Sequence, residues 1–298
     1  MACHADTGDM VPTRKMGQLN SAMPAGRPFV RIVHLSDLHF GATDPRLEQG
    51  LCDDLAALAA SGAVDALVIS GDLTQRARPG QFAVAAGYVQ KISQLLGSHT
   101  ASGSHTPLLL TPGNHDVPLW NLVARSLHPL NNFRRGTTGL GVDALAVGNV
   151  AIATANSARR CSLRPRGFWK DGLLNRQRLA GAAAALRAAN TRWRVLVTHH
   201  PAAVAGGLSK AEIVHGWQNV ARQIENAGVN VILGGHLHEP YVTQISLPAG
   251  GKATYIAAGT AISTRRRHAP NTYNVLEFGD ELRVERRDWT GQGFVPVG

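Results

Sequence analysis

The feature that most constrains this chain is a polar pattern that follows five short apolar segments. The segments end near Leu35, Ser70, Leu110, Val197 and Leu233, and Asp, Asn or His follows each within a few residues. Short runs rich in aliphatic residues are typical of buried strands. Because ligands bind outside the carboxyl ends of strands in open α/β sheets, we expect these polar side chains to converge there.

Helical segments separate several of the strands, which predicts βα units. We expect helices over residues 45–60, 80–96, 175–189 and 211–227. The expected strands cover residues 29–35, 64–70, 108–110, 144–147, 150–155, 194–197, 229–233, 241–245, 253–257, 272–278 and 282–286. After residue 241 the pattern is strand only. It predicts one α/β domain over residues 28–298, closed by a set of antiparallel strands.

Composition sets the broad class. The chain has 298 residues, of which 44% are hydrophobic and 17% charged, which is enough for a real core. Residues 1–27 lack periodicity and a signal-peptide core, so we expect a flexible tail or a misassigned start. No apolar run approaches the roughly 20 residues of a membrane helix. Three cysteines without paired spacing fit a reducing, cytoplasmic setting.

The net charge of +10 favours anionic partners, either a substrate phosphate, nucleic acid or an anionic membrane. The arginines are scattered along the chain, so a solubilising surface explains the charge equally well. Charge alone does not choose between these alternatives.

Seven side chains beyond the strand ends are of types that bind divalent metals. They are Asp37, His39, Asp72, Asn114, His199, His236 and His238. Seven groups are too many for one tetrahedral zinc but suit two ions that share one ligand. The pairs Asp37/His39 and His236/His238 would each point to one face if the backbone stays extended. Neighbouring glycines would let the backbone turn tightly and come close to bound ions.

Five ordered motifs carry a resemblance to a known family. They are Asp37-Leu38-His39, Gly71-Asp72, Gly113-Asn114-His115-Asp116, Thr198-His199-His200-Pro201 and Gly235-His236-Leu237-His238. In this order, over residues 29–260, they resemble the calcineurin-like metallophosphoesterase superfamily. The resemblance implies an α/β fold in the form of a four-layer α/β/β/α sandwich, with a dinuclear metal centre.

The resemblance also implies which ligands hold which ion. One ion would take Asp37, His39, Asp72 and His238, and the other Asp72, Asn114, His199 and His236. Asp72 is then the bridge. Between two ions about 3.5 to 4 Å apart, a bridging water would lose its proton near neutral pH and attack phosphorus in line. Mixed imidazole and carboxylate ligation suits two divalent ions of Mn, Fe or Zn.

Three further residues in these motifs receive other roles. By resemblance, His115 would stabilise the transition state or protonate the leaving oxygen, and Asp116 would orient it. The first histidine of the pair at 199 and 200 is expected to be the ligand, which leaves His200 as either a packing residue or part of the substrate site. His34, inside a strand, is expected in the core or supporting the centre.

The motif forms resemble those of bacterial cyclic-nucleotide phosphodiesterases and depart from those of protein Ser/Thr phosphatases. We therefore expect a phosphodiesterase that acts on a small phosphodiester or nucleotide, without specific nucleic-acid binding. A UDP-2,3-diacylglucosamine pyrophosphate hydrolase, in peripheral contact with an anionic membrane, is the enzymatic alternative. A non-catalytic scaffold of the same fold is another, although such scaffolds typically lose metal-ligand histidines and this chain keeps every position.

Two features near the motifs stay open. Arg76, Arg78 and residues 265–267 would either bind substrate phosphate through their guanidinium groups or form a solvated face. Residues 117–121 would either cover the metals or contribute Trp120 as a core anchor.

Overall fold

The computed structural model describes residues 27–98, 105–160, 170–203 and 213–297. The tail expected over residues 1–27 lies outside the described residues, except for Arg27. Within the described part of the chain, no helix has the length and apolar character needed to cross a membrane.

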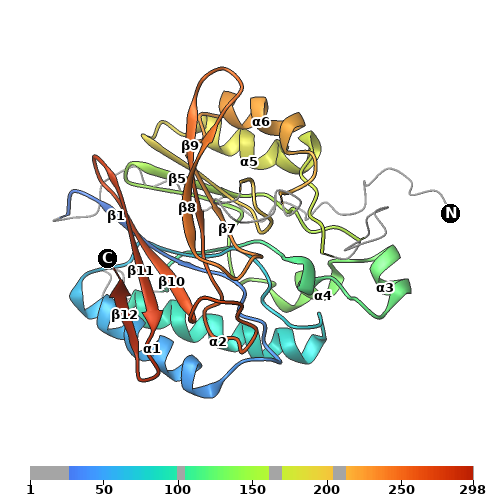
Figure 1. The fold of residues 1–298 in the computed structure, drawn as a ribbon, viewed down its shortest axis with the longest axis vertical. Coiled ribbons are helices and arrows are strands. Elements are labelled where there is room, and N and C mark those ends of the chain that lie inside the picture. The colour runs from blue at the N-terminus through green and yellow to red at the C-terminus, as the bar shows by residue number, and fades with distance from the viewer. Residues whose placement is uncertain (1–26, 99–104, 161–169, 204–212, 298) are drawn as a thin grey trace.

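The first of two six-stranded sheets has the order β12-β11-β10-β1-β2-β3 (Figure 1). Its strands are β1 (Val30–Leu35), β2 (Ala66–Ile69), β3 (Leu108–Leu110), β10 (Thr272–Phe278), β11 (Leu282–Trp289) and β12 (Phe294–Val297). Strands β1 to β3 run parallel, whereas β10 to β12 add as an antiparallel extension. The sequence pattern did not predict β12, a short strand that contains a proline.

The second sheet has the order β4-β5-β6-β7-β9-β8. Its strands are β4 (Ala144–Val147), β5 (Val150–Thr154), β6 (Trp193–Val197), β7 (Val231–Gly234), β8 (Tyr241–Ser246) and β9 (Lys252–Ala257). Strand β9 pairs parallel to β7, while β8 is antiparallel at the edge. The closing strands expected as one antiparallel set are therefore divided between two sheets.

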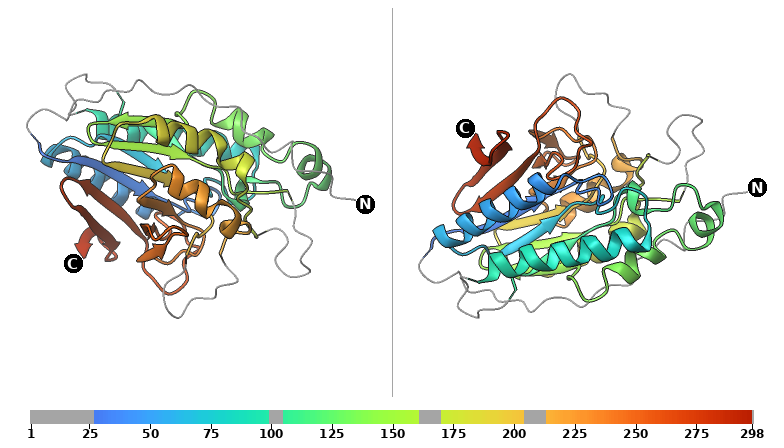
Figure 2. Two further views of the ribbon diagram at one scale, coloured as in Figure 1. Left: turned by 90° about the horizontal axis from the view of Figure 1, so that it is seen from above. Right: turned by 90° about the horizontal axis from the view of Figure 1, so that it is seen from below.

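Four helices complete the layers. Helices α1 (Pro45–Ser61) and α2 (Pro79–Gly97) pack on the outer face of the first sheet, and α5 (Arg176–Ala188) and α6 (Trp217–Asn226) on that of the second. Figure 2 shows one helix pair from above and the other from below. Between the sheets lies an apolar layer that includes Ile32 of β1 and Val195 of β6. This arrangement is the expected four-layer α/β/β/α sandwich.

Irregular segments differ most from expectation. Helix α6 begins at Trp217, although a start at residue 211 was expected. Residues 211 and 212 lie outside the described part of the chain, and residues 213–216 are not helical. The His215 backbone instead bonds to Gly172 and Leu174, and Gly216 follows with a φ of 80° that a helix interior does not use. Three short helical segments, 3₁₀ segment η2 (Asn114–Asp116), α3 (Leu122–Leu127) and α4 (Asn131–Gly136), occupy the region after β3.

Candidate metal centre

The carboxyl ends of β1, β2 and β7 bring four of the predicted ligands together. Potential ligand atoms of Asp37, His39, Asp72 and His238 lie within 4.8 Å of one another. Nε2 of His238 lies 3.1 Å from Nε2 of His39 and 3.2 Å from Oδ1 of Asp37. Oδ2 of Asp72 lies 3.7 Å from Nε2 of His39. These distances define the first half of the candidate centre.

The other three predicted ligands meet on the opposite side of Asp72. Oδ2 of Asp72 is 3.4 Å from Nε2 of His199, which is 3.2 Å from Oδ1 of Asn114. The same Asn114 oxygen is 2.9 Å from Nδ1 of His236. The structure thus brings all seven predicted side chains together, with Asp72 between the two halves. We call these seven residues the floor.

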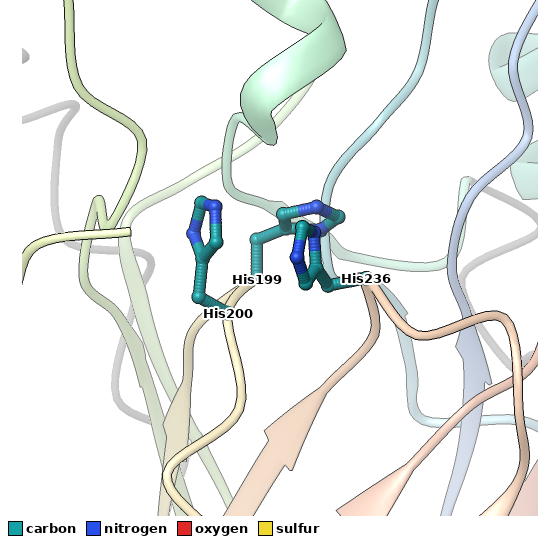
Figure 3. Close-up of side chains that lie close together, drawn as sticks. All are labelled: His199, His200 and His236. Carbon is teal, nitrogen blue, oxygen red and sulfur yellow. The ribbon is translucent and has the colours of Figure 1, made fainter. Parts of the chain in front are cut away.

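His200 lies beside the floor, but its ring nitrogens contact residues outside the floor. Figure 3 shows His199 and His200 beyond β6 and His236 beyond β7, with potential ligand atoms of the three close together. However, Nδ1 of His200 is 2.8 Å from Oγ of Ser157, and Nε2 donates to the Lys170 carbonyl at 2.8 Å. Burial and the neighbouring His236 lower the pKa of His200 well below its usual value. His200 is therefore neutral, and both of its ring nitrogens are hydrogen-bonded within the protein.

The floor has an unusual backbone. Asp37, His39, Asp72, His236 and His238 have φ values of 53°, 50°, 52°, 74° and 57°. Residues other than glycine rarely adopt this left-handed region, and each such residue costs about 1–3 kcal/mol. The condition under which each ligand pair would point to one face, an extended backbone, is not met, because the chain turns at every one of these ligands.

Hydrogen bonds between loops hold this backbone in place. The N–H of Asp37 donates to the Gly71 carbonyl at 3.1 Å, and that of His39 to the Asp72 carbonyl at 2.9 Å. A side chain at Gly113 would overlap the Asp72 carboxylate, so only glycine permits this close approach. The tight packing expected of the motif glycines is therefore present.

Each floor carboxylate has one oxygen bonded to the protein and one directed into the centre. Oδ2 of Asp37 accepts from Oγ of Ser36 at 2.6 Å and from the His236 N–H at 3.0 Å. Oδ1 of Asp37 is buried and accepts no hydrogen bond from any described residue. Oδ1 of Asp72 accepts from the His115 N–H at 2.8 Å. Such outer support with an unused inner oxygen fits a metal ligand.

The electrostatics also fit cations. Burial alone would raise the pKa of Asp72, but the charge of His199 holds it well below its usual value. Burial alone would lower the pKa of His199, but Asp72 raises it to about 9. Burial lowers the pKa of His39 to about 4. A proton on His199 thus balances the buried Asp72 carboxylate, and a divalent ion would replace that proton. The cluster fits a dinuclear metal site.

His115 is oriented by a backbone carbonyl. Its Nδ1 lies 2.9 Å from the Gln75 carbonyl, which can only accept. The expectation that Asp116 orients His115 is wrong. The buried Asp116 carboxylate instead accepts from the N–H groups of Leu73, Thr74 and Gly113 at 3.1, 2.9 and 3.0 Å. Asp116 ties two ligand loops together, since its oxygens serve backbone donors from both.

A cavity of about 200 Å³ opens above the floor. Its walls include Asp72, His115 and four cationic residues, namely Lys170 and Arg265 to Arg267. We call these four cationic residues the rim. Arg76 and Arg78 do not line the cavity. Trp120 is 79% exposed and is not a core anchor, and no residue of 117–121 lines the cavity as a cover would.

Comparison with known proteins gives the family. A family model described as calcineurin-like phosphoesterase matches residues 30–240, which is more than half of the chain. The chain belongs to the calcineurin-like phosphoesterase family. The match includes every floor residue, and it bears out the resemblance seen in the five motifs. A search of curated proteins gave no match.

Solved structures share the calcineurin-like phosphoesterase fold at low identity. A structure of PhoD aligns with a TM-score of 0.61 at 11% identity, over 93% of this chain and 69% of that one. A dimetal phosphatase from Danio rerio aligns with a TM-score of 0.57 at 13% identity, over 91% of this chain and 99% of that one. GAP50, the anchor in the inner membrane complex of Plasmodium, aligns with a TM-score of 0.52 at 11% identity, over 91% of this chain and 85% of that one. At these identities the likeness establishes the fold alone.

Sequence reasoning missed three residues around this phosphoesterase centre. Ser36 and Gln75 hold Asp37 and His115, and Lys170 stands on the rim. Ser36 directly precedes a motif, so its position was a usable signal. A backbone carbonyl such as that of Gln75 leaves no trace in side-chain patterns, and Lys170 belongs to no motif.

Proposed function

We propose that this chain is a phosphodiesterase that uses two divalent metal ions, Mn, Fe or Zn. One ion would be held by Asp37, His39, Asp72 and His238, and the other by Asp72, Asn114, His199 and His236. The observation that carries the proposal is the position of Asp72 Oδ2, which faces His39 on one side and His199 on the other at 3.7 and 3.4 Å. One carboxylate shared between two donor sets is the arrangement that a two-metal hydrolase needs.

Two ions bound there supply a water of lowered pKa and neutralise charge on the phosphoryl oxygens. The protein fixes the geometry. The His115 N–H holds Oδ1 of Asp72, which keeps the other oxygen directed into the centre. With Nδ1 of His115 donating to the Gln75 carbonyl, Nε2 is the ring nitrogen that exchanges protons. We assign His115 as the group that protonates the leaving oxygen.

A small phosphodiester is the proposed substrate class, with cyclic nucleotides and related phosphodiesters as the first compounds to test. A cavity of about 200 Å³ is below the roughly 300–1,000 Å³ typical of pockets that enclose a whole ligand. It would hold the phosphate and its immediate neighbours, while the remainder of the substrate lies outside. The same chemistry would cleave a UDP-diacylglucosamine pyrophosphate, so that compound belongs in the same test.

The test is hydrolysis by protein stripped with a chelator and reloaded separately with Mn²⁺, Fe²⁺ or Zn²⁺. We expect metal-dependent release of nitrophenol from bis(p-nitrophenyl) phosphate, and none from the stripped protein. A panel of cyclic nucleotides, phosphomonoesters, glycerophosphodiesters and UDP-diacylglucosamine then identifies the preferred bond. Absence of turnover with all three metals, in protein that contains two ions per chain, would contradict the enzyme and favour a binding scaffold.

A further inference from the structure

The rim comes from two segments that are distant in sequence. Lys170 precedes α5, and Arg265 to Arg267 lie between β9 and β10. Lys170, Arg266 and Arg267 are exposed, and Arg265 is half-buried. The guanidinium groups of Arg266 and Arg267 make no hydrogen bond or ion pair with another described residue. Two cationic side chains beside the cavity are thus available to a ligand.

Both rim segments are held by histidines of the centre. Nε2 of His200 donates to the Lys170 carbonyl at 2.8 Å, and Nδ1 of His238 bonds to the Arg265 carbonyl. The N–H of Arg265 donates in addition to Oγ of Ser263 at 3.1 Å. Backbone fixed in this way places the cations beside the floor reproducibly, whereas a solvated basic surface needs no such attachment.

The charges at the cavity exceed what one phosphodiester requires. Among the described residues that line it, Asp72 is the only acidic one, and the floor already uses it. Two divalent ions would neutralise the single negative charge of a phosphodiester without help from the rim. The exposed guanidinium groups of Arg266 and Arg267 therefore point to additional negative charge on the ligand, which guanidinium groups bind through paired hydrogen bonds.

We propose that the rim is a second anion subsite, so that the substrate carries another anionic group next to the scissile phosphodiester. This inference rests on the proposed function and names the substrate class for it. A linear diphosphate diester, or a phosphodiester with a neighbouring carboxylate or phosphate, meets the requirement. A 3′,5′-cyclic nucleotide carries one negative charge and leaves the rim unused.

Three non-hydrolysable probes separate these ligands. Methylphosphonate has one anionic group, phosphonoacetate adds a carboxylate, and methylenediphosphonate adds a second phosphonate. Binding to the metal-loaded protein is measured by calorimetry for wild type, Arg266→Gln and Arg267→Gln. The matched control is Arg76→Gln, which removes an exposed arginine that follows Asp72 but lies outside the cavity lining.

We expect each rim variant to weaken methylenediphosphonate about tenfold, since a hydrogen bond to a charged group contributes about 1.5 kcal/mol. Methylphosphonate should lose less than about twofold, because it does not reach the rim. If the rim variants also lose affinity for phosphonoacetate, the subsite accepts any second anionic group. If their affinity for phosphonoacetate is unchanged, the subsite is specific for a phosphoryl group. The control should match wild type for all three probes.

Equal losses of affinity for all three probes would overturn the subsite, because they would indicate only a general attraction of anions to the basic surface. The subsite would also be overturned if the rim variants bound all three probes as tightly as wild type. Wild-type turnover of bis(p-nitrophenyl) phosphate keeps the two proposals apart, since that substrate has a single anionic group. If it is hydrolysed while the probes show no selectivity, the subsite fails and the phosphodiesterase stands. If it is not hydrolysed, the proposed function fails whatever the probes show.

Discussion

The floor and the rim of the cavity are built in opposite ways. Floor residues Asp37, His39 and His199 are fully buried, and five floor residues have left-handed backbone. Arg266 and Arg267 on the rim are exposed, and their φ values are not positive. The floor backbone is therefore strained and is held by interlocking hydrogen bonds, whereas the rim presents charge on exposed side chains. Under the two proposals above, this difference suits the floor to the reaction and the rim to the substrate.

Removing the shared carboxylate should give the largest effect. Asp72→Asn keeps the side-chain shape and tolerates the left-handed backbone, but it lacks the charge that both halves share. We expect activity to fall at least about a thousandfold, because the metals contribute several kcal/mol to transition-state stabilisation. Metal content should fall below two ions per chain by mass spectrometry. A variant that retains both ions would remove Asp72 from the role of bridge.

His115→Ala should separate catalysis from metal binding. The Asp72 carboxylate is held by the backbone N–H of residue 115, which alanine retains. We therefore expect two ions per chain and a rate about a hundredfold lower or more, as is typical for loss of a general acid. Single-turnover kinetics and metal analysis on the same sample check both expectations. A full rate, or lost metal, would contradict the assignment of His115.

The outer support of the floor should have an intermediate effect. Ser36→Ala removes the hydroxyl that donates to Oδ2 of Asp37 at 2.6 Å. Loss of such a partner typically weakens metal affinity about ten- to a hundredfold. Ser61→Ala is the matched control, because Oγ of Ser61 donates to the carbonyl of Leu58 at an exposed position and makes no contact with the floor. If metal titration gives equal affinities for both variants, the His236 N–H alone orients Asp37.

The smallest expected effect is on how the free energy of unfolding depends on pH through the buried His34. Burial lowers the pKa of His34 from 6.5 to about 3, and its Nε2 is 2.9 Å from Oγ of Ser70. Because the folded pKa is lowered, neutral His34 stabilises the protein fully above pH 6.5, and this contribution is lost as the pH falls toward 3. His34→Gln removes the dependence.

Denaturant unfolding of the metal-free protein measures this effect. Between about pH 7 and about pH 5.5, wild type should lose about 1 kcal/mol more than His34→Gln. The exposed His128 supplies the control, since His128→Gln should follow wild type. Identical pH dependence in all three proteins would mean that His34 titrates in the folded state as it does when unfolded.

Sequence patterns were sufficient to predict which side chains come together in the floor, and they were insufficient for the residues around it. Strand ends could be located because β-branched runs such as that of β1 stop at polar residues, and parallel strands bring those ends together. The orientation of His115 was out of reach, since it depends on the carbonyl of Gln75. The short strand β12 was also missed, because pairing with β11 outweighs its weak local preference.

Interpretation also failed where one residue type serves two purposes. A carboxylate beside a histidine often orients it, yet Asp116 binds backbone N–H groups of two loops. A tryptophan usually anchors a core, yet Trp120 is exposed, and so are Val123 and Leu127 of the six-residue helix α3 that follows it. Only tertiary placement distinguishes these outcomes.

The left-handed ligands have a consequence for transplanting such centres into other proteins. Introducing the sequence Asp37-Leu38-His39 into a regular strand of another protein would reproduce the residue types but not the left-handed turn at each ligand. The transferable unit is the backbone path together with the loops that bond to it. A search of unrelated structures for aspartates and histidines clustered at positive φ should therefore find comparable centres where no sequence similarity remains.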